Sequence, residues 1–344
     1  MILALLSLVG VQDPPAPPAA FVAAAEYSQA QGGLTLAVRD AEGELVFEHY
    51  SGGLGPDNAL PLYSAGHGLW AVAALAAEQD GLLELEAPVA RWLSAWQGIV
   101  AKEEVLVRQL LDMTAGLDPN PKHVRSTFTA DRYKAAVASR MTERAGVRFR
   151  FGPSTWMVFG ALLGEIGKPR EEDAFAYLKR RVLEPIGIQT RAWERDGVGN
   201  AMIPYGAYLT AREWSKLGAF LLACGRVGEE QVIEAERLEK LWRPCPVKEG
   251  YGLGFWRRSS LTHVVEEDES PGEVQAQSDA TDLLAGLPED IYFSAGLGGA
   301  RLYVIPSRSL TVARHALETG QWSDVHFLRL LLDAPAPAPA EDGD

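Results

Sequence analysis

The chain reads Pro61-Leu62-Tyr63-Ser64-Ala65-Gly66-His67-Gly68-Leu69-Trp70-Ala71 just before an apolar, alanine-rich run that ends at Asp80-Gly81. The apolar run predicts a buried helix that begins close to Ser64. A serine at that position suits nucleophilic catalysis, because a helix N-terminus stabilises negative charge and offers free backbone N–H groups to an oxyanion. His67 lies three residues later on the same helical face, where its imidazole can hydrogen-bond the serine hydroxyl.

The same residues have simpler interpretations that stay open at this point. Ser64 can be an ordinary helix N-cap, and a single histidine is commonly structural. The helix dipole disfavours a charged imidazolium near the N-terminus, so we expect His67 to be neutral near pH 7 and able to accept a proton. No neighbouring carboxylate is an obvious partner to orient His67, and Asp112 is the first candidate to inspect.

Strand signals lie at both ends of the chain. Strands are expected at residues 34–39 and 45–49, joined by a glycine turn, and a second hairpin is expected at residues 301–305 and 310–314. Helices are expected at residues 21–31 and 323–332, and most of residues 65–242 reads as helical. This order predicts one antiparallel sheet built from both ends of the chain, with a helical subdomain inserted at roughly residues 85–240.

The ends of the chain differ in composition from the region between them. Residues 1–12 are apolar and too short to span a bilayer, so they read as a signal peptide and predict export to the periplasm or the extracellular space. Residues 13–19 form a Pro/Ala linker, residues 20–333 one folded domain, and residues 334–344 a disordered Pro/Ala/acidic tail. The stretch 265–290, with 9 acidic and no basic residues, reads as a surface loop.

Composition excludes several classes of function. The 344 residues carry a net charge of −14, which argues against a nucleic-acid-binding groove. The 6 histidines are scattered and only 2 cysteines are present, so we expect neither a metal site nor a cofactor. Cys224 and Cys245 either pair or remain separate thiols. No other segment suits stable membrane insertion, and nothing in the sequence points to a protein partner.

Eight segments together resemble, in the correct order, motifs of the serine β-lactamase and penicillin-binding protein superfamily. The closest resemblance is to its β-lactamase-related branch of class C-type esterases, peptidases and 6-aminohexanoate-dimer-type amidases. Each segment is weak evidence alone, but their common order makes the resemblance specific. The segments are the Ser64 segment and residues 79–89, 107–117 (similar to "LLTHTSGL"), 149–154, 185–188 ("PLGI"), 208–213 ("YMTARDL"), 251–256 and 296–306.

The resemblance implies an α/β sandwich, with helices flanking an antiparallel sheet and an all-helical subdomain beside it. It also implies acyl transfer from a small-molecule amide or ester to Ser64. His67 stands where the family has the lysine of S-x-x-K. The family's oxyanion site maps onto the backbone N–H groups of Ser64 and Leu297.

The sequence departs from the family at each position that moves protons. Phe151 replaces the motif tyrosine, Pro153 replaces the asparagine two residues later, and Ser294-Ala295-Gly296 replaces Lys/His-Thr-Gly. These positions are expected to line the cleft. Two functions follow: a serine hydrolase in which His67 is the base, or a catalytically inactive relative that keeps the cleft for binding or keeps only the fold. Esterase, amidase or peptidase action is expected more than β-lactamase action, because the motifs that grip a β-lactam carboxylate are missing.

Overall fold

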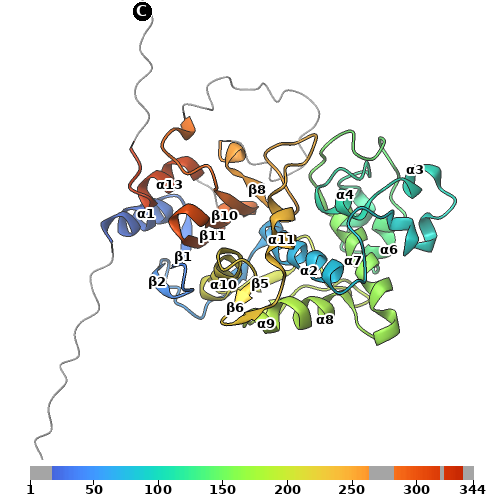
Figure 1. The fold of residues 1–344 in the computed structure, drawn as a ribbon, viewed down its shortest axis with the longest axis horizontal. Helices are drawn as coiled ribbons and strands as arrows, with labels where there is room; N and C mark the ends of the chain where they lie inside the picture. The colour runs from blue at the N-terminus through green and yellow to red at the C-terminus, as the bar shows by residue number, and fades with distance from the viewer. Residues whose placement is uncertain (1–17, 263–282, 318–320, 336–344) are drawn as a thin grey trace, which may run out of the picture.

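The computed structural model describes residues 18–262, 283–317 and 321–335, and its centre is a six-stranded antiparallel sheet (Figure 1). Both ends of the chain contribute strands, as the sequence predicts, and the strand order is β2-β1-β11-β10-β9-β8. The strands are β1 (Gly33–Arg39), β2 (Leu45–Tyr50), β8 (Trp256–Arg257), β9 (Tyr292–Gly296), β10 (Ala300–Ile305) and β11 (Leu310–Ala316).

Helices cover both faces of this sheet. Helices α1 (Ala19–Ala30) and α13 (Asp324–Leu331) pack together on one face, where the rings of Tyr303 and Phe327 lie 5.6 Å apart. Helix α10 (Ala211–Leu222) covers the other face, so closely that a Cβ on Gly218 would lie 1.8 Å from Thr311 Oγ1. Because side chains alternate along a strand, the side chain of each residue in β9 and β10 faces either helices α1 and α13 or helix α10.

Helix α2 (His67–Gln79) runs through the centre of the molecule, between the sheet and the helical subdomain (Figure 1). Every residue from His67 to Ala77 is buried, because this helix is apolar on all sides. Gly68 lets the ring of Phe255 approach, since a Cβ there would lie 2.7 Å from that ring. A separate 3₁₀ turn, η1 (Tyr63–Gly66), precedes the helix and holds Ser64.

The middle of the chain is largely helical, but it also contains short strands that the sequence analysis did not predict. Strand β3 (Leu60–Pro61) pairs with β5 (Ala207–Leu209), which pairs with β4 (Ala192–Trp193), and β6 (Arg226–Val227) pairs with β7 (Glu230–Gln231). The helices here are α3 (Val100–Glu103), α4 (Val107–Leu111), α5 (Lys122–Arg125), α6 (Arg132–Val137), α7 (Pro153–Gly167), α8 (Ala174–Leu178), α9 (Glu184–Ile186) and α11 (Ala235–Leu238).

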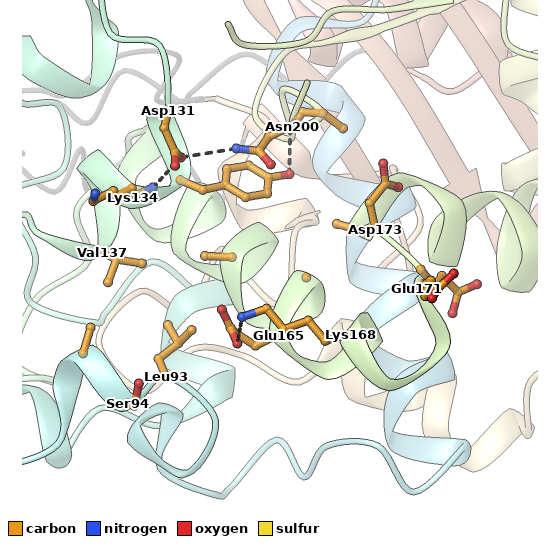
Figure 2. A pocket seen from close by; sticks show the side chains of 17 residues that line it. Leu93, Ser94, Asp131, Lys134, Val137, Glu165, Lys168, Glu171, Asp173 and Asn200 are labelled. Atoms are coloured by element: carbon orange, nitrogen blue, oxygen red, sulfur yellow. Dashed lines mark hydrogen bonds and ion pairs between the residues drawn. The ribbon is translucent and has the colours of Figure 1, made fainter. Parts of the chain in front are cut away.

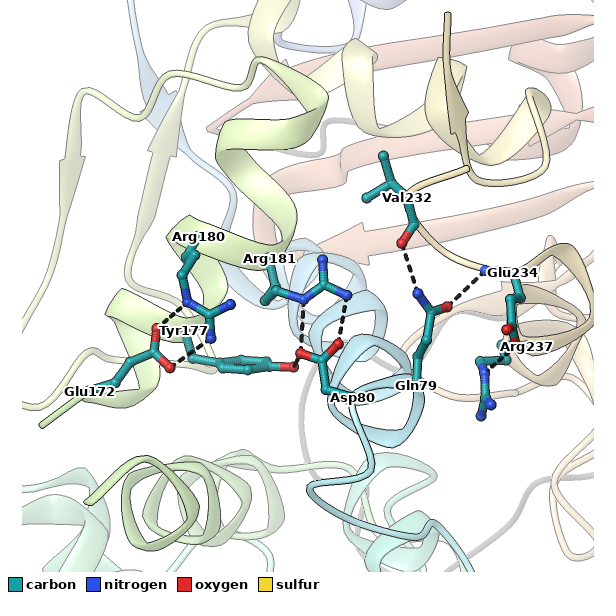
Figure 3. Close-up of polar contacts among 9 residues, drawn as sticks. All are labelled: Gln79, Asp80, Glu172, Tyr177, Arg180, Arg181, Val232, Glu234 and Arg237. Carbon is teal, nitrogen blue, oxygen red and sulfur yellow. Dashed lines mark hydrogen bonds and ion pairs between the residues drawn. The ribbon is translucent and has the colours of Figure 1, made fainter. Parts of the chain in front are cut away.

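Polar contacts fix the C-terminal end of α2 on two sides (Figure 3). Asp80 accepts two hydrogen bonds of 2.8 Å from Arg181, which a π-helical turn (Lys179–Leu183) presents, and one of 2.9 Å from Tyr177. Gln79 donates to the Val232 carbonyl at 3.0 Å and accepts from the Glu234 N–H at 2.9 Å. The helix that follows the serine turn is therefore held at the end farthest from Ser64.

Several expectations fall on residues outside the described ranges: the signal peptide, most of the Pro/Ala linker, the larger part of the acidic stretch 265–290 and most of the C-terminal tail. Helix α1 begins at Ala19, two residues before its expected start. In the described ranges, every helix is too short or too polar to cross a bilayer.

Candidate active site

Ser64 lies in the 3₁₀ turn η1 rather than in the first turn of α2, and the two are joined by a bond from the His67 N–H to the Ser64 carbonyl. Its neighbour Tyr63 has a φ of 48°, a left-handed conformation that strains a residue of this size. The Ser64 side chain is half-buried, and its hydroxyl makes no hydrogen bond within the described part of the chain. The turn therefore presents an unengaged hydroxyl just ahead of a helix N-terminus.

The end of strand β9 packs directly against this turn. A Cβ on Gly296 would lie 2.2 Å from the Leu62 carbonyl oxygen and 3.0 Å from the Ala65 nitrogen, so only glycine fits. Leu297 follows at once, and neither its N–H nor that of Ser64 donates to an acceptor outside its own turn among the described residues. Two main-chain donors are thus free beside the serine, as an oxyanion site requires.

His67 is buried, at 3% exposure, and its ring lies flat on Trp156 at 4.5 Å with 5° between the planes. Its Nε2 has no hydrogen-bond partner, and no side-chain hydrogen bond joins His67 to Ser64 within the described residues. Burial lowers the pKa of His67 to about 3, because the charged imidazolium would lose its hydration without gaining a partner. The imidazole is therefore neutral near pH 7, and it is a weak proton acceptor.

Phe151 occupies the tyrosine position beside His67, with 6.1 Å between the ring centroids. It is 6% exposed and stacks on Trp256 at 6.0 Å. Pro153 begins helix α7, and the preceding Gly152 packs against the Pro119 carbonyl, which a Cβ would approach to 2.3 Å. Apolar packing thus fills the positions where the resemblance places a phenol and an amide.

Strand β9 carries the third motif and sends its side chains to opposite faces of the sheet. Ser294 lies on the face of Gly296, the side of the serine turn, and its fully buried hydroxyl has no hydrogen-bond partner among the described residues. Ala295 pairs in register with Arg301, on the face of α13. Arg301 binds Asp324 there, with distances of 2.8 and 3.3 Å. Arg301 therefore lies on the opposite side of the sheet from Ser64.

Asp112 does not orient His67. Its carboxylate accepts from the hydroxyl of Thr114 at 2.5 Å, from the Thr114 N–H at 3.1 Å and from Arg108 at 3.2 Å. Burial raises the pKa of Asp112 to about 6. No other hydrogen-bonded carboxylate reaches His67 in the part of the chain that the structure describes, so the imidazole has no orienting acid.

A family model for Beta-lactamase matches residues 19–320, well over half of the chain. The chain therefore belongs to the Beta-lactamase family. No curated protein sequence matches it.

Solved structures share the fold of this Beta-lactamase-family protein at low sequence identity. A penicillin-binding protein homologue from Caulobacter crescentus is 18% identical, with a TM-score of 0.68, over 93% of this chain and 98% of that one. A family VIII carboxylesterase is 16% identical with a TM-score of 0.66 (92% and 95% covered), and a β-lactamase from Mycobacterium bovis is 18% identical with a TM-score of 0.60 (90% and 97% covered). At such identities the likeness concerns the fold.

The Beta-lactamase-family site includes residues that the sequence analysis did not identify. The strain at Tyr63 cannot be seen in a sequence, because tyrosine seldom adopts positive φ. The stacking of Trp156 on His67 and of Trp256 on Phe151 depends on contacts between segments that are distant in the sequence. These stacks enclose His67 and Phe151 in aromatic rings.

A separate cavity of about 590 Å³ lies in the helical subdomain (Figure 2). Its lining includes Tyr133, Ala161 and Gly164, and Glu165 is paired with Lys168 at 2.5 Å on its rim. Neither Ser64 nor any of the motif residues contributes to it. Within the described ranges no three His, Cys, Asp or Glu side chains are grouped to bind a metal ion.

Proposed function

We propose that this Beta-lactamase-family protein is a serine hydrolase in which Ser64 accepts the acyl group of an activated ester. The observation that carries this proposal is the packing of Gly296 against the serine turn, which sets two free main-chain N–H donors beside an unengaged hydroxyl. Such donors stabilise the oxyanion of the tetrahedral intermediate and supply much of the rate enhancement of serine hydrolases. These donors are main-chain groups positioned by the backbone, so they remain although the motif side chains of the family are replaced.

The reaction uses water as its second reactant. Ser64 Oγ forms a bond to the acyl carbon while the bond from that carbon to the leaving oxygen breaks, and the hydroxyl proton passes to water or hydroxide. The leaving group departs as an alkoxide or a phenolate. Water then attacks the acyl-enzyme, which releases a carboxylic acid and restores Ser64. His67 contributes little as a base, because an imidazolium between Trp156 and Phe151 is strongly disfavoured.

A fluorophosphonate probe tests the assignment of the nucleophile. We expect the probe to label the intact protein at one site, identified as Ser64 by peptide mass spectrometry, and Ser64→Ala to remove the label. Ser154, whose buried hydroxyl lies in the first turn of α7, provides the matched control Ser154→Ala, which keeps the label. Labelling that persists in Ser64→Ala contradicts the proposal.

The nature of the leaving group provides a second prediction. An amide needs a general acid to protonate its departing nitrogen, and such catalysis typically supplies about 10²–10⁴-fold. Phe151 and the neutral His67 provide no such acid, whereas a phenolate leaves unassisted. We therefore expect Ser64-dependent acylation to favour a nitrophenyl ester over the matching nitroanilide about as strongly as hydrolysis in buffer does, because neither the site nor the buffer provides a positioned general acid. A nitroanilide whose acylation is enhanced about 100-fold or more beyond that of the ester would show that a general acid is present.

The unpartnered imidazole favours one further candidate function, reversible ligand binding without turnover. His67 Nε2 and Ser294 Oγ are both buried without a hydrogen-bond partner in the described ranges, at positions where the resemblance places catalytic side chains. A ligand that bonds to these atoms would satisfy them. The absence of any Ser64 label from both the fluorophosphonate and the nitrophenyl ester would favour this candidate over the hydrolase.

A further inference from the structure

Among the described residues, the side chains at the motif positions carry no formal charge. Ser64 and Ser294 contribute hydroxyls, His67 is neutral, and Phe151 contributes an apolar ring. The two main-chain donors of the oxyanion site are neutral as well. A charged group on a ligand would lose its hydration here without gaining a counter-ion from these residues.

Arg301 is the cation nearest in sequence to the third motif, and it is not directed to the serine. It is 2% exposed and lies opposite Ala295, on the sheet face that α13 covers. Its guanidinium holds Asp324 with two contacts and donates to the Gly296 carbonyl at 3.1 Å. A substrate carboxylate would have to displace these bonds and cross the sheet to reach Arg301. Arg301 therefore does not bind the substrate.

Two leucines of the described chain are exposed beside the proposed oxyanion site. Leu297, whose own N–H is an oxyanion donor, has a side chain that is 46% exposed. The next residue, Gly298, has a φ of 72° and packs on the backbone of Leu317, which is 52% exposed. Because the oxygen of a bound acyl group lies at the Leu297 N–H, the atoms attached to the acyl carbon lie within reach of the Leu297 side chain.

We propose that the site selects esters with neutral, apolar acyl groups against esters whose acyl group ends in a carboxylate, and that Leu297 is the residue that contacts the acyl group. This inference rests on the proposed acylation of Ser64. Burial of an apolar chain against Leu297 is favourable, whereas a carboxylate in the same place is desolvated without a partner.

Two esters of equal chain length test the selection: p-nitrophenyl hexanoate and the mono-p-nitrophenyl ester of adipic acid. The Ser64-dependent acylation rate is measured for each near pH 7, after subtraction of the rate given by Ser64→Ala. We expect the neutral ester to react faster by at least about tenfold, the discrimination that a single group in an apolar pocket provides. Leu297→Arg is expected to reduce this ratio at least about tenfold, because the new guanidinium pairs with the terminal carboxylate.

A matched control places the same charge far from the site. Val227 is 38% exposed on the β6–β7 hairpin, near the opposite end of α2, and Val227→Arg should leave the ratio unchanged. Equal reaction of both esters, or faster reaction of the adipate, overturns the selectivity while acylation of Ser64 stands. An unchanged ratio in Leu297→Arg overturns the role of Leu297. The absence of Ser64-dependent acylation by either ester overturns the proposed function together with this inference.

Discussion

Gly296→Ala is expected to reduce acylation of Ser64 by about 100- to 1,000-fold, the loss that follows removal of one oxyanion donor. The added Cβ would lie 2.2 Å from the Leu62 carbonyl oxygen, so the end of β9 and the serine turn must separate. Separation moves the Leu297 N–H away from the oxyanion. The rate of fluorophosphonate labelling measures the effect, and circular dichroism shows whether the variant remains folded.

The serine turn itself offers the matched control for this substitution. A Cβ on Gly66 would meet Ala207 Cβ at 3.7 Å, an ordinary van der Waals contact, and Gly66 has a negative φ. Gly66→Ala should therefore label at a rate within about threefold of the wild type, because its neighbours need not move. If Gly296→Ala also labels at the wild-type rate, the Leu297 N–H is not part of the oxyanion site.

The second large effect is a loss of stability in acid that comes from two buried histidines. Burial lowers the pKa of His67 to about 3, and burial together with Arg314 lowers that of His315 to about 3. The unfolded chain takes up protons at these groups below about pH 6.5, whereas the folded chain does not. Each histidine therefore reduces the unfolding free energy by about 1.4 kcal/mol for every pH unit between about 6.5 and 3.

Asp112 opposes this loss in part. Its folded-state pKa is raised to about 6. Its contribution to the unfolding free energy is therefore fully present below its unfolded pKa and is lost as the pH rises through 6. Between about pH 6 and 4 the two histidines outweigh the one carboxyl, and the unfolding free energy should fall by about 1.4 kcal/mol per pH unit. Urea unfolding at several pH values measures this slope.

Variants of the histidines separate their contributions. His315→Gln or His67→Gln should each reduce the slope of the unfolding free energy against pH by the contribution of about one proton, because one group with a lowered pKa is gone. A wild-type protein whose unfolding free energy is constant from about pH 7 to pH 4 would show that the buried imidazoles are solvated or charged in the folded state.

The sequence predicts four strands of the six-stranded sheet, β1, β2, β10 and β11, because these carry local signals, whereas β8 and β9 were not predicted. In the β1–β2 and β10–β11 hairpins, turn residues separate the two strands at the expected places. The helices at both ends of the chain have apolar residues at helical spacing. The short strands β3, β4 and β5 were missed because two- or three-residue strands are stabilised by pairing with distant partners and have no periodicity of their own.

The candidate site was predictable at Ser64 and Gly296 and less so around them. Motif order locates the serine turn and the third motif, and local spacing cannot show that His67 lies flat on Trp156, 89 positions later in the chain. The orientation of Arg301 likewise depends on the register of β9 against β10, which decides the face of each side chain. The environments of His67 and Arg301 therefore became visible only in the tertiary structure.

Strand β1 pairs with β11, so β1 finds one of its neighbours only after the long stretch of chain between the two strands has been synthesised. Until then its edge is open, and a nascent chain on the ribosome exposes unpaired main-chain groups that invite association with other chains. The closing contacts are also far apart in sequence, which slows folding. Production of this protein should therefore gain from slow translation at low temperature and from chaperones that shield strand edges.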